Sequence, residues 1–130
     1  MRKKILVVDD ELSVCEGVKL VLESSGYDVK AAPSGEDAVR MVELEDFDIV
    51  LMDLIMPGMD GADACEKIKS MKPHVHVLAI SGSPSLERLE KFLHAGGIEV
   101  YLYKPFGKEE LIDAIEKVFR GEYMKFHENA

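Results

Sequence analysis

The chain has 130 residues, of which 25 are acidic and 16 basic, and its formal net charge at pH 7 is -9. A chain of this length typically forms one domain with a substantial core. The negative charge argues against direct binding to nucleic acids or anionic membranes, which favour a basic surface. No apolar run approaches the roughly 20 residues of a membrane-spanning helix, and we expect a cytoplasmic protein.

Short apolar runs alternate with helical patterns along the chain. The runs have the length of strands and comprise residues 4–8, 27–32, 49–52, 75–80 and 98–103. Apolar residues at helical spacing follow each run, in 12–25, after Ser34, from Asp60 to Pro73, from Ser83 to Gly96 and around 111–119. Strands and helices that alternate in this way predict an α/β fold, with parallel strands, right-handed crossovers and helices on both faces of the sheet.

Capping and breaking residues delimit the predicted helices. Ser34 and Asp60 stand at N-cap positions, and Gly26 and Gly121 stand where helical patterns stop. The last nine residues have no periodicity. We therefore expect one domain over residues 1–121 and a short C-terminal tail over 122–130.

Polar side chains follow four of the predicted strands. They are Asp9 and Asp10 after the first strand, Asp53 after the third, Ser81 after the fourth and Lys104 after the fifth. The carboxyl ends of parallel strands share one edge of the sheet, which is where ligands bind in open α/β sheets. We therefore expect these side chains to converge although they are far apart in the sequence.

This combination of side chains favours phosphoryl transfer to a carboxylate. Clustered carboxylates repel one another, and a hard divalent cation such as Mg²⁺ relieves the repulsion. Asp53 is then a candidate nucleophile, because carboxylates form aspartyl phosphates in other proteins. Lys104 and Ser81 supply the charge and the hydroxyl that a transferred phosphoryl group requires.

Three motifs resemble the receiver domain of two-component response regulators. They are Val7-Val8-Asp9-Asp10-Glu11, Met52-Asp53-Leu54-Ile55-Met56-Pro57-Gly58-Met59-Asp60-Gly61 and Tyr101-Leu102-Tyr103-Lys104-Pro105-Phe106, with Ser81 between the last two. The resemblance covers about residues 3–119. It implies a flavodoxin-like, doubly wound parallel sheet of five strands in the order 2-1-3-4-5, with five helices.

The resemblance also implies roles for individual residues. Asp53 would accept the phosphoryl group, Asp9, Asp10, Asp53 and the backbone carbonyl of Ile55 would bind Mg²⁺, for which Mn²⁺ can substitute, and Ser81 and Lys104 would contact the phosphoryl group. Ser81 and Tyr101 would form a switch pair, and the peptide bond before Pro105 would be cis.

The implied protein is a signalling phosphoacceptor that transforms no other substrate. A sensor histidine kinase or a phosphotransfer protein would be the donor. Phosphorylation would change the face formed by the fourth helix, the fifth strand and the fifth helix. A downstream protein, and neither nucleic acid nor membrane, would bind that face.

Three other interpretations remain open from the sequence. A phosphorylation-independent interaction module of the same fold would not react with phosphodonors. A phosphatase with an aspartate nucleophile would have a second aspartate at position 55, where this chain has Ile55. A flavodoxin would need a phosphate-binding loop where Asp9 and Asp10 stand.

Other residues have simpler interpretations. Cys15 and Cys65 fall within apolar helical patterns and are expected to be buried free thiols. His74 and His76 are expected to face solvent and not to bind zinc, and Tyr103 is expected to be exposed. Val100 and Gly96-Gly97-Ile98 depart from the usual pattern of the family near the fifth strand.

We predict slow self-dephosphorylation. By the resemblance, Ile55 and Ser83 occupy the positions that tune the attack of water on the acyl phosphate, and an isoleucine side chain has no group that orients water. The phosphorylated protein should therefore lose its phosphoryl group slowly in Mg²⁺ buffer, as followed on a phosphate-affinity gel. A lifetime of only seconds would contradict this prediction.

Overall fold

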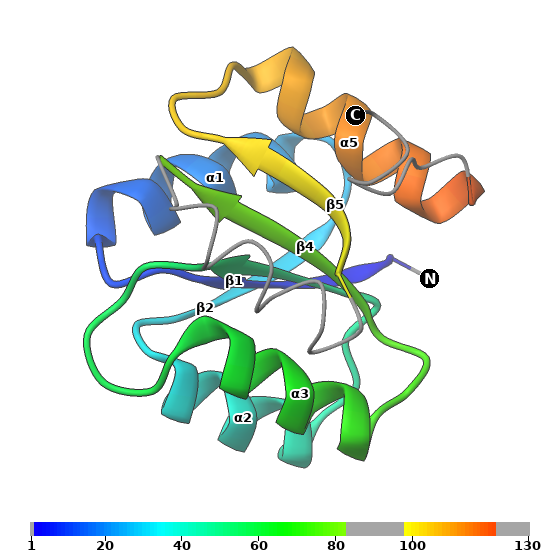
Figure 1. Cartoon of the computed structure of the whole chain (residues 1–130). Coiled ribbons are helices and arrows are strands. Elements are labelled where there is room, and N and C mark those ends of the chain that lie inside the picture. The colour runs from blue at the N-terminus through cyan, green and yellow to red at the C-terminus, as the bar shows by residue number, and fades with distance from the viewer. Residues whose placement is uncertain (1, 83–97, 122–130) are drawn as a thin grey trace, which may run out of the picture.

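Five strands form one parallel sheet at the centre of the molecule (Figure 1). The structure is a computed structural model, and it describes residues 2–82 and 98–121. The strands are β1 (Lys4–Val8), β2 (Asp28–Ala32), β3 (Ile49–Asp53), β4 (His76–Ser81) and β5 (Ile98–Tyr103). Their order is β2-β1-β3-β4-β5 and each neighbouring pair is parallel. This arrangement confirms the predicted flavodoxin-like sheet.

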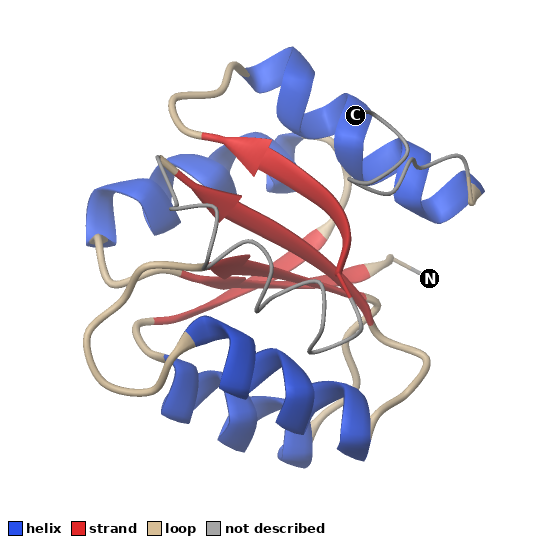
Figure 2. Ribbon diagram, viewed as in Figure 1, coloured by secondary structure: helices blue, strands red, loops and turns tan. Residues whose placement is uncertain are grey.

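Helices cover both faces of the sheet (Figure 2). The described helices are α1 (Leu12–Ser24), α2 (Gly35–Leu44), α3 (Gly61–Met71) and α5 (Lys108–Arg120). In Figure 1, α1 and α5 lie on one face, and α2 and α3 lie side by side on the other. The helix expected between Ser83 and Gly96 lies outside the described residues. No helix in the described part is long and apolar enough to cross a membrane.

The alternation of side chains along the inner strands divides the core into two clusters. From β1, Leu6 and Val8 point to the cluster under α2 and α3, whereas Ile5 and Val7 point to the cluster under α1 and α5. All five residues of β3 are buried. A strand covered on both faces needs apolar side chains in both directions, which explains the unbroken apolar run before Asp53.

Local hydrogen bonds fix the helix ends where the sequence predicts them. Ser34 Oγ accepts a hydrogen bond from Asp37 N at 3.1 Å, and Asp60 Oδ1 accepts one from Ala62 N at 2.8 Å. At the end of α1, Gly26 has φ 96°. Its N–H donates to Glu23 O, and the N–H of Tyr27 donates to Leu22 O. This pair of bonds is a Schellman motif, which requires a left-handed residue at Gly26.

The predicted strand limits are correct to within one residue on described positions. β2 begins at Asp28 and not at Tyr27, and β4 begins at His76 and not at Val75. β3 and β4 each extend one residue further than predicted, so that Asp53 and Ser81 are the last residues of their strands. The backbone of both candidate residues is therefore held by the hydrogen bonding of the sheet itself.

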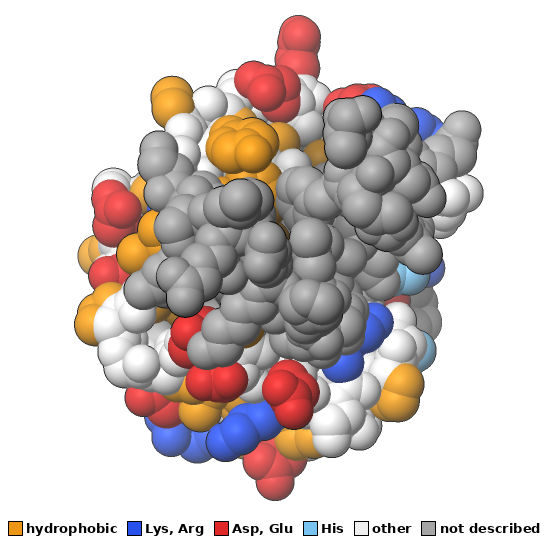
Figure 3. All heavy atoms as spheres, in the orientation of Figure 1, with side chains coloured by type: hydrophobic (Ala, Val, Ile, Leu, Met, Phe, Trp, Pro, Cys, Tyr) orange, Lys and Arg blue, Asp and Glu red, His pale blue; other side chains and the backbone are white. Residues whose placement is uncertain are grey.

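Side chains outside the candidate site largely match their predicted environments. Cys15 and Cys65 are free and buried, which confirms the expectation for both thiols. His74 and Tyr103 are exposed, whereas His76 is half-buried at the start of β4. On the face shown in Figure 3, described acidic side chains appear at the top, at the left and over the lower half, where basic and apolar side chains lie among them.

We predict opposite effects of alanine at two glycines near α1. A Cβ at Gly17, inside the helix, would meet no atom within 4 Å. Gly17→Ala should therefore raise the free energy of unfolding by about 0.5–1 kcal/mol, because alanine favours the helix. Gly26→Ala should lower it by about 1 kcal/mol, because φ at Gly26 is positive. Urea unfolding measures both, and a destabilising Gly17→Ala would contradict the prediction.

Candidate phosphoacceptor and metal site

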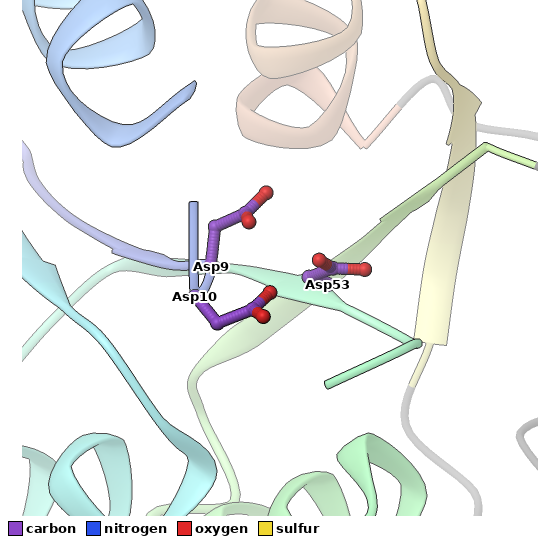
Figure 4. Close-up of side chains that lie close together, drawn as sticks. All are labelled: Asp9, Asp10 and Asp53. Atoms are coloured by element: carbon purple, nitrogen blue, oxygen red, sulfur yellow. The ribbon is translucent and has the colours of Figure 1, made fainter. Parts of the chain in front are cut away.

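Three carboxylates lie together at the carboxyl ends of β1 and β3. Asp9 directly follows β1, and Asp53 is the last residue of β3. Val8 pairs with Met52 in the sheet register, and this pairing brings Asp9 next to Asp53. Asp9, Asp10 and Asp53 each offer a carboxylate oxygen within 4.8 Å of the others (Figure 4). Asp9 and Asp53 are buried, whereas Asp10 is exposed.

Lys104 binds both buried carboxylates. Its Nζ lies 2.7 Å from Asp9 Oδ2 and 3.3 Å from Asp53 Oδ2. Glu11 Oε1 is further away, at 3.9 Å. The backbone N–H of Lys104 donates to Ser81 O at 2.8 Å, which ties the residue after β5 to the end of β4. The Lys104–Pro105 peptide bond is cis.

Backbone donors hold the second oxygen of each buried carboxylate. Glu11 N donates to Asp9 Oδ1 at 2.9 Å, and Ile55 N donates to Asp53 Oδ1 at 3.0 Å. In both aspartates, Lys104 therefore contacts Oδ2 while the amide two residues further along the chain contacts Oδ1. The two side chains are fixed in orientation before any ligand binds.

The environment of Asp53 stabilises its protonated form more than water does, so its pKa is raised. Burial raises its pKa to about 6, and the neighbouring Asp9 charge acts in the same direction. The hydrogen bond from Ile55 N and the charge of Lys104 oppose this shift without cancelling it. Burial would lower the pKa of Lys104, but its bonds and charge interactions with Asp9 and Asp53 raise it above its usual value. The lysine is therefore charged, but its single positive charge does not balance the three clustered carboxylates.

Ser81 and Tyr101 lie next to each other beside the carboxylates. Asp53 pairs with Ile80 in the sheet, so Ser81 is one residue beyond the partner of Asp53. Its hydroxyl is buried and makes no hydrogen bond of normal geometry with a described residue. Burial raises the pKa of Tyr101 to about 12, and interaction with the Ser81 hydroxyl opposes part of that shift. Tyr101 is half-buried and packs against the cluster under α2 and α3.

The donor set of this site suits a hard cation. Over residues 2–82 and 98–121, the carboxylates of Asp9, Asp10 and Asp53 are the group that meets the geometry of a metal site. They offer only oxygen, which is the ligand that Mg²⁺ and other hard divalent cations prefer. The neighbouring backbone of Ile55 is close to Asp53, since its N–H is bonded to that side chain.

Two contacts of the site were not predicted from the sequence. Glu11 lies at the edge of the cluster near Lys104, and Cys15 Sγ donates to the backbone oxygen of Asp9 at 3.4 Å. Burial and the charge of Asp9 raise the pKa of the Cys15 thiol. The position of Glu11 directly after Asp10 was the one available signal for its contact. Cys15 showed only an apolar helical pattern.

Comparison with known sequences identifies the family to which this chain is similar. Residues 5–116 match the response regulator receiver domain. The chain is 32% identical over 117 residues to the cell cycle transcriptional regulator CtrA of Caulobacter vibrioides, covering 90% of this chain and 50% of that protein. It is 35% identical over 121 residues to the transcriptional regulatory protein PhoP of Bacillus subtilis, covering 92% and 50%. The chain thus spans about half the length of these curated relatives.

Solved structures agree with this result. The chain resembles a CheY-like receiver domain protein from Methanospirillum hungatei with a TM-score of 0.90 and 30% identity, over 94% of this chain and 97% of the other. The chemotaxis protein CheY4 of Vibrio cholerae gives a TM-score of 0.84 and 28% identity, over 91% and 99%.

The raised pKa of Asp53 predicts how stability depends on pH. The folded protein, with a pKa near 6, binds this proton more tightly than the unfolded chain, with a pKa near 3.8. The contribution of Asp53 to stability is therefore full below pH 3.8 and is lost as the pH rises through about 6. In EDTA at pH 7.5, Asp53→Asn should be more stable than the wild type by about 2–3 kcal/mol.

Denaturant unfolding of both proteins between pH 4 and 7.5 measures this difference. The two stabilities should converge as the pH falls toward 4, because the wild-type carboxyl then becomes neutral like the amide. A difference that does not change with pH would show that burial does not disfavour the Asp53 charge.

Proposed function

Because this chain belongs to the response regulator receiver domain family, we propose that it is a phosphorylation-activated signalling switch. Asp53 accepts the phosphoryl group, and the donor is the phosphohistidine of a sensor histidine kinase or of a phosphotransfer protein. One observation carries the proposal: three carboxylates lie within 4.8 Å of one another, and Lys104 contacts the two that are buried. The receiver domain spans residues 1–121, with residues 122–130 as a tail.

The proposed reaction moves one phosphoryl group between two side chains. A carboxylate oxygen of Asp53 attacks the phosphorus of phosphohistidine, so that a P–O bond forms and the P–N bond breaks. The electron pair of the broken bond returns to the imidazole nitrogen, which takes a proton from solvent. The contact between Lys104 Nζ and Asp53 Oδ2 supports a role for the lysine beside the oxygens of the incoming group.

Mg²⁺ is the proposed cofactor, and Mn²⁺ can substitute. Asp9, Asp10, Asp53 and the backbone carbonyl of Ile55 would hold it, with Asp9 acting mostly through water. The bound cation would neutralise the carboxylates and the phosphoryl oxygens, which Lys104 alone does not do. The oxygen-only donor set and the raised pKa of Asp53 support this assignment.

The proposed switch consists of Ser81 and Tyr101. The Ser81 hydroxyl turns toward the phosphoryl group, and Tyr101 occupies the vacated space. The position of Ser81 at the end of β4 and the half-buried ring of Tyr101 support this coupling. The change alters the face that includes β5 and α5, on which Tyr103 is 56% exposed. The phosphoryl group must favour the active state by several kcal/mol to convert a mostly inactive population.

The output of this switch is binding to another protein. The named relatives are transcriptional regulators that are about twice as long as this chain. We propose that this chain acts in the cytoplasm through a protein partner, with no direct contact to nucleic acid or membrane. It catalyses its own phosphorylation and dephosphorylation and no reaction of another substrate.

Intact-mass spectrometry after incubation with acetyl phosphate and Mg²⁺ tests the proposal. The wild type should gain one phosphoryl group, and EDTA should prevent the gain. Asp53→Asn, which keeps the shape of the side chain, should gain none, whereas Asp48→Asn before β3 should behave as the wild type. An unmodified wild type would contradict the switch and favour a phosphorylation-independent interaction module.

A further inference from the structure

The loop that joins β3 to α3 packs against the first turn of α2. This loop runs from Leu54 to Asp60, and it begins directly after Asp53 (Figure 1). At its start, Leu54 N donates to Ile80 O in β4, and Ile55 N donates to Asp53 Oδ1. At its end, Asp60 caps α3. The backbone between these ends carries the carbonyl of Ile55.

The first contact from α2 is made by its backbone. Gly35 is the first residue of α2 and is buried. A Cβ built on it would lie 3.3 Å from Met59 Cβ, 3.3 Å from Ala64 Cβ and 3.4 Å from Met59 O. Such distances are tighter than ordinary van der Waals contact, so the start of α2 lies directly against the loop and the first turn of α3.

The second contact is a hydrogen bond from the loop to a carboxylate. Met59 N donates to Glu36 Oε1 at 3.3 Å. The same carboxylate lies over Gly58, where a Cβ would be 3.1 Å from Glu36 Oε2. Gly58 has φ 85°, which other residues rarely adopt. Glu36 thus lies over the glycine of the loop that has a positive φ.

We propose that Glu36 is a positioning residue for the metal site. It fixes Met59 and so limits the positions open to the backbone of Ile55, whose carbonyl would bind Mg²⁺. This inference rests on the proposed function, because it assigns a purpose to the position of a proposed metal ligand. Glu36 contacts none of the three clustered carboxylates in the described structure and acts through the loop alone.

The strength of this contact is sufficient for a measurable effect. A hydrogen bond to a charged group is stronger than one between neutral groups, and exposure to solvent reduces its contribution to stability. Metal binding is sensitive to the position of each ligand, because Mg²⁺ requires nearly ideal octahedral geometry. Loosening one end of the loop should therefore weaken metal binding more than it weakens the fold.

Isothermal titration of the metal-free protein with MgCl₂ alone tests this inference. Glu36→Ala removes the acceptor and should weaken Mg²⁺ binding by about fivefold, as expected if part of one hydrogen bond is transmitted to the site. Glu36→Gln keeps an oxygen acceptor and should bind nearly as tightly as the wild type. Both variants remove the same charge from the first turn of α2, so their difference isolates the hydrogen bond.

Glu43→Ala is the matched control. Glu43 is exposed on the same helix and makes no hydrogen bond or ion pair with a described residue, so its removal should leave Mg²⁺ binding unchanged. Thermal unfolding in EDTA should differ little among all four proteins. Amide hydrogen exchange at Met59 should be faster in Glu36→Ala than in Glu36→Gln.

The outcomes separate this inference from the proposed function. Equal Mg²⁺ affinity of Glu36→Ala and the wild type would overturn the positioning role and leave the metal site intact. Equal weakening in Glu36→Ala and Glu36→Gln would also overturn it, because charge and not the acceptor would then be responsible. A wild type that binds no Mg²⁺ would overturn the metal site first, and the positioning role with it.

Discussion

Repulsion between carboxylates at one edge of the sheet is the constraint on which the rest of the structure depends. Two of these side chains are buried, and a single ammonium group is shared between them. Charges in such a place are unfavourable unless they are paired and hydrogen-bonded. Lys104 and two backbone amides provide part of that compensation. A site that remains short of positive charge is suited to receive a cation.

The fold makes this unfavourable arrangement possible. β1 and β3 are central strands, and their neighbours on both sides fix the direction of the side chains that follow. The two core clusters, one on each face, provide the burial that stabilises the sheet. The hydrogen bonding of the sheet therefore fixes where the site lies, at the ends of these strands.

The sequence was most informative where one physical requirement determines the residue type. A strand buried on both faces must be apolar, so the apolar run at residues 49–52 predicted β3. Asp53 was a candidate functional residue because it places a carboxylate at the end of that apolar run. Helix ends with a capping side chain, such as Ser34 and Asp60, were predicted for the same reason. Parallel pairing then explained why acids far apart in the chain meet.

Contacts between a helix and a loop could not be predicted in this way. The bond from Met59 N joins the β3–α3 loop to Glu36 in the first turn of α2, and the sequence of neither segment identifies the other as its partner. The contact of Cys15 with the backbone of Asp9 is similar, because the thiol appears in the sequence only as one apolar position of a helix. Such contacts depend on the exact packing of α1 and α2, which local sequence does not specify.

The most direct test of this account is the pKa of the Asp53 carboxyl, measured by carbon-13 NMR with and without Mg²⁺. Without the metal, the carboxyl should titrate near pH 6, because burial and Asp9 disfavour its charge. With saturating Mg²⁺, the pKa should fall well below that value, since the cation stabilises the carboxylate. An ordinary pKa in both samples would contradict the claim that this cluster is a strained site completed by a cation.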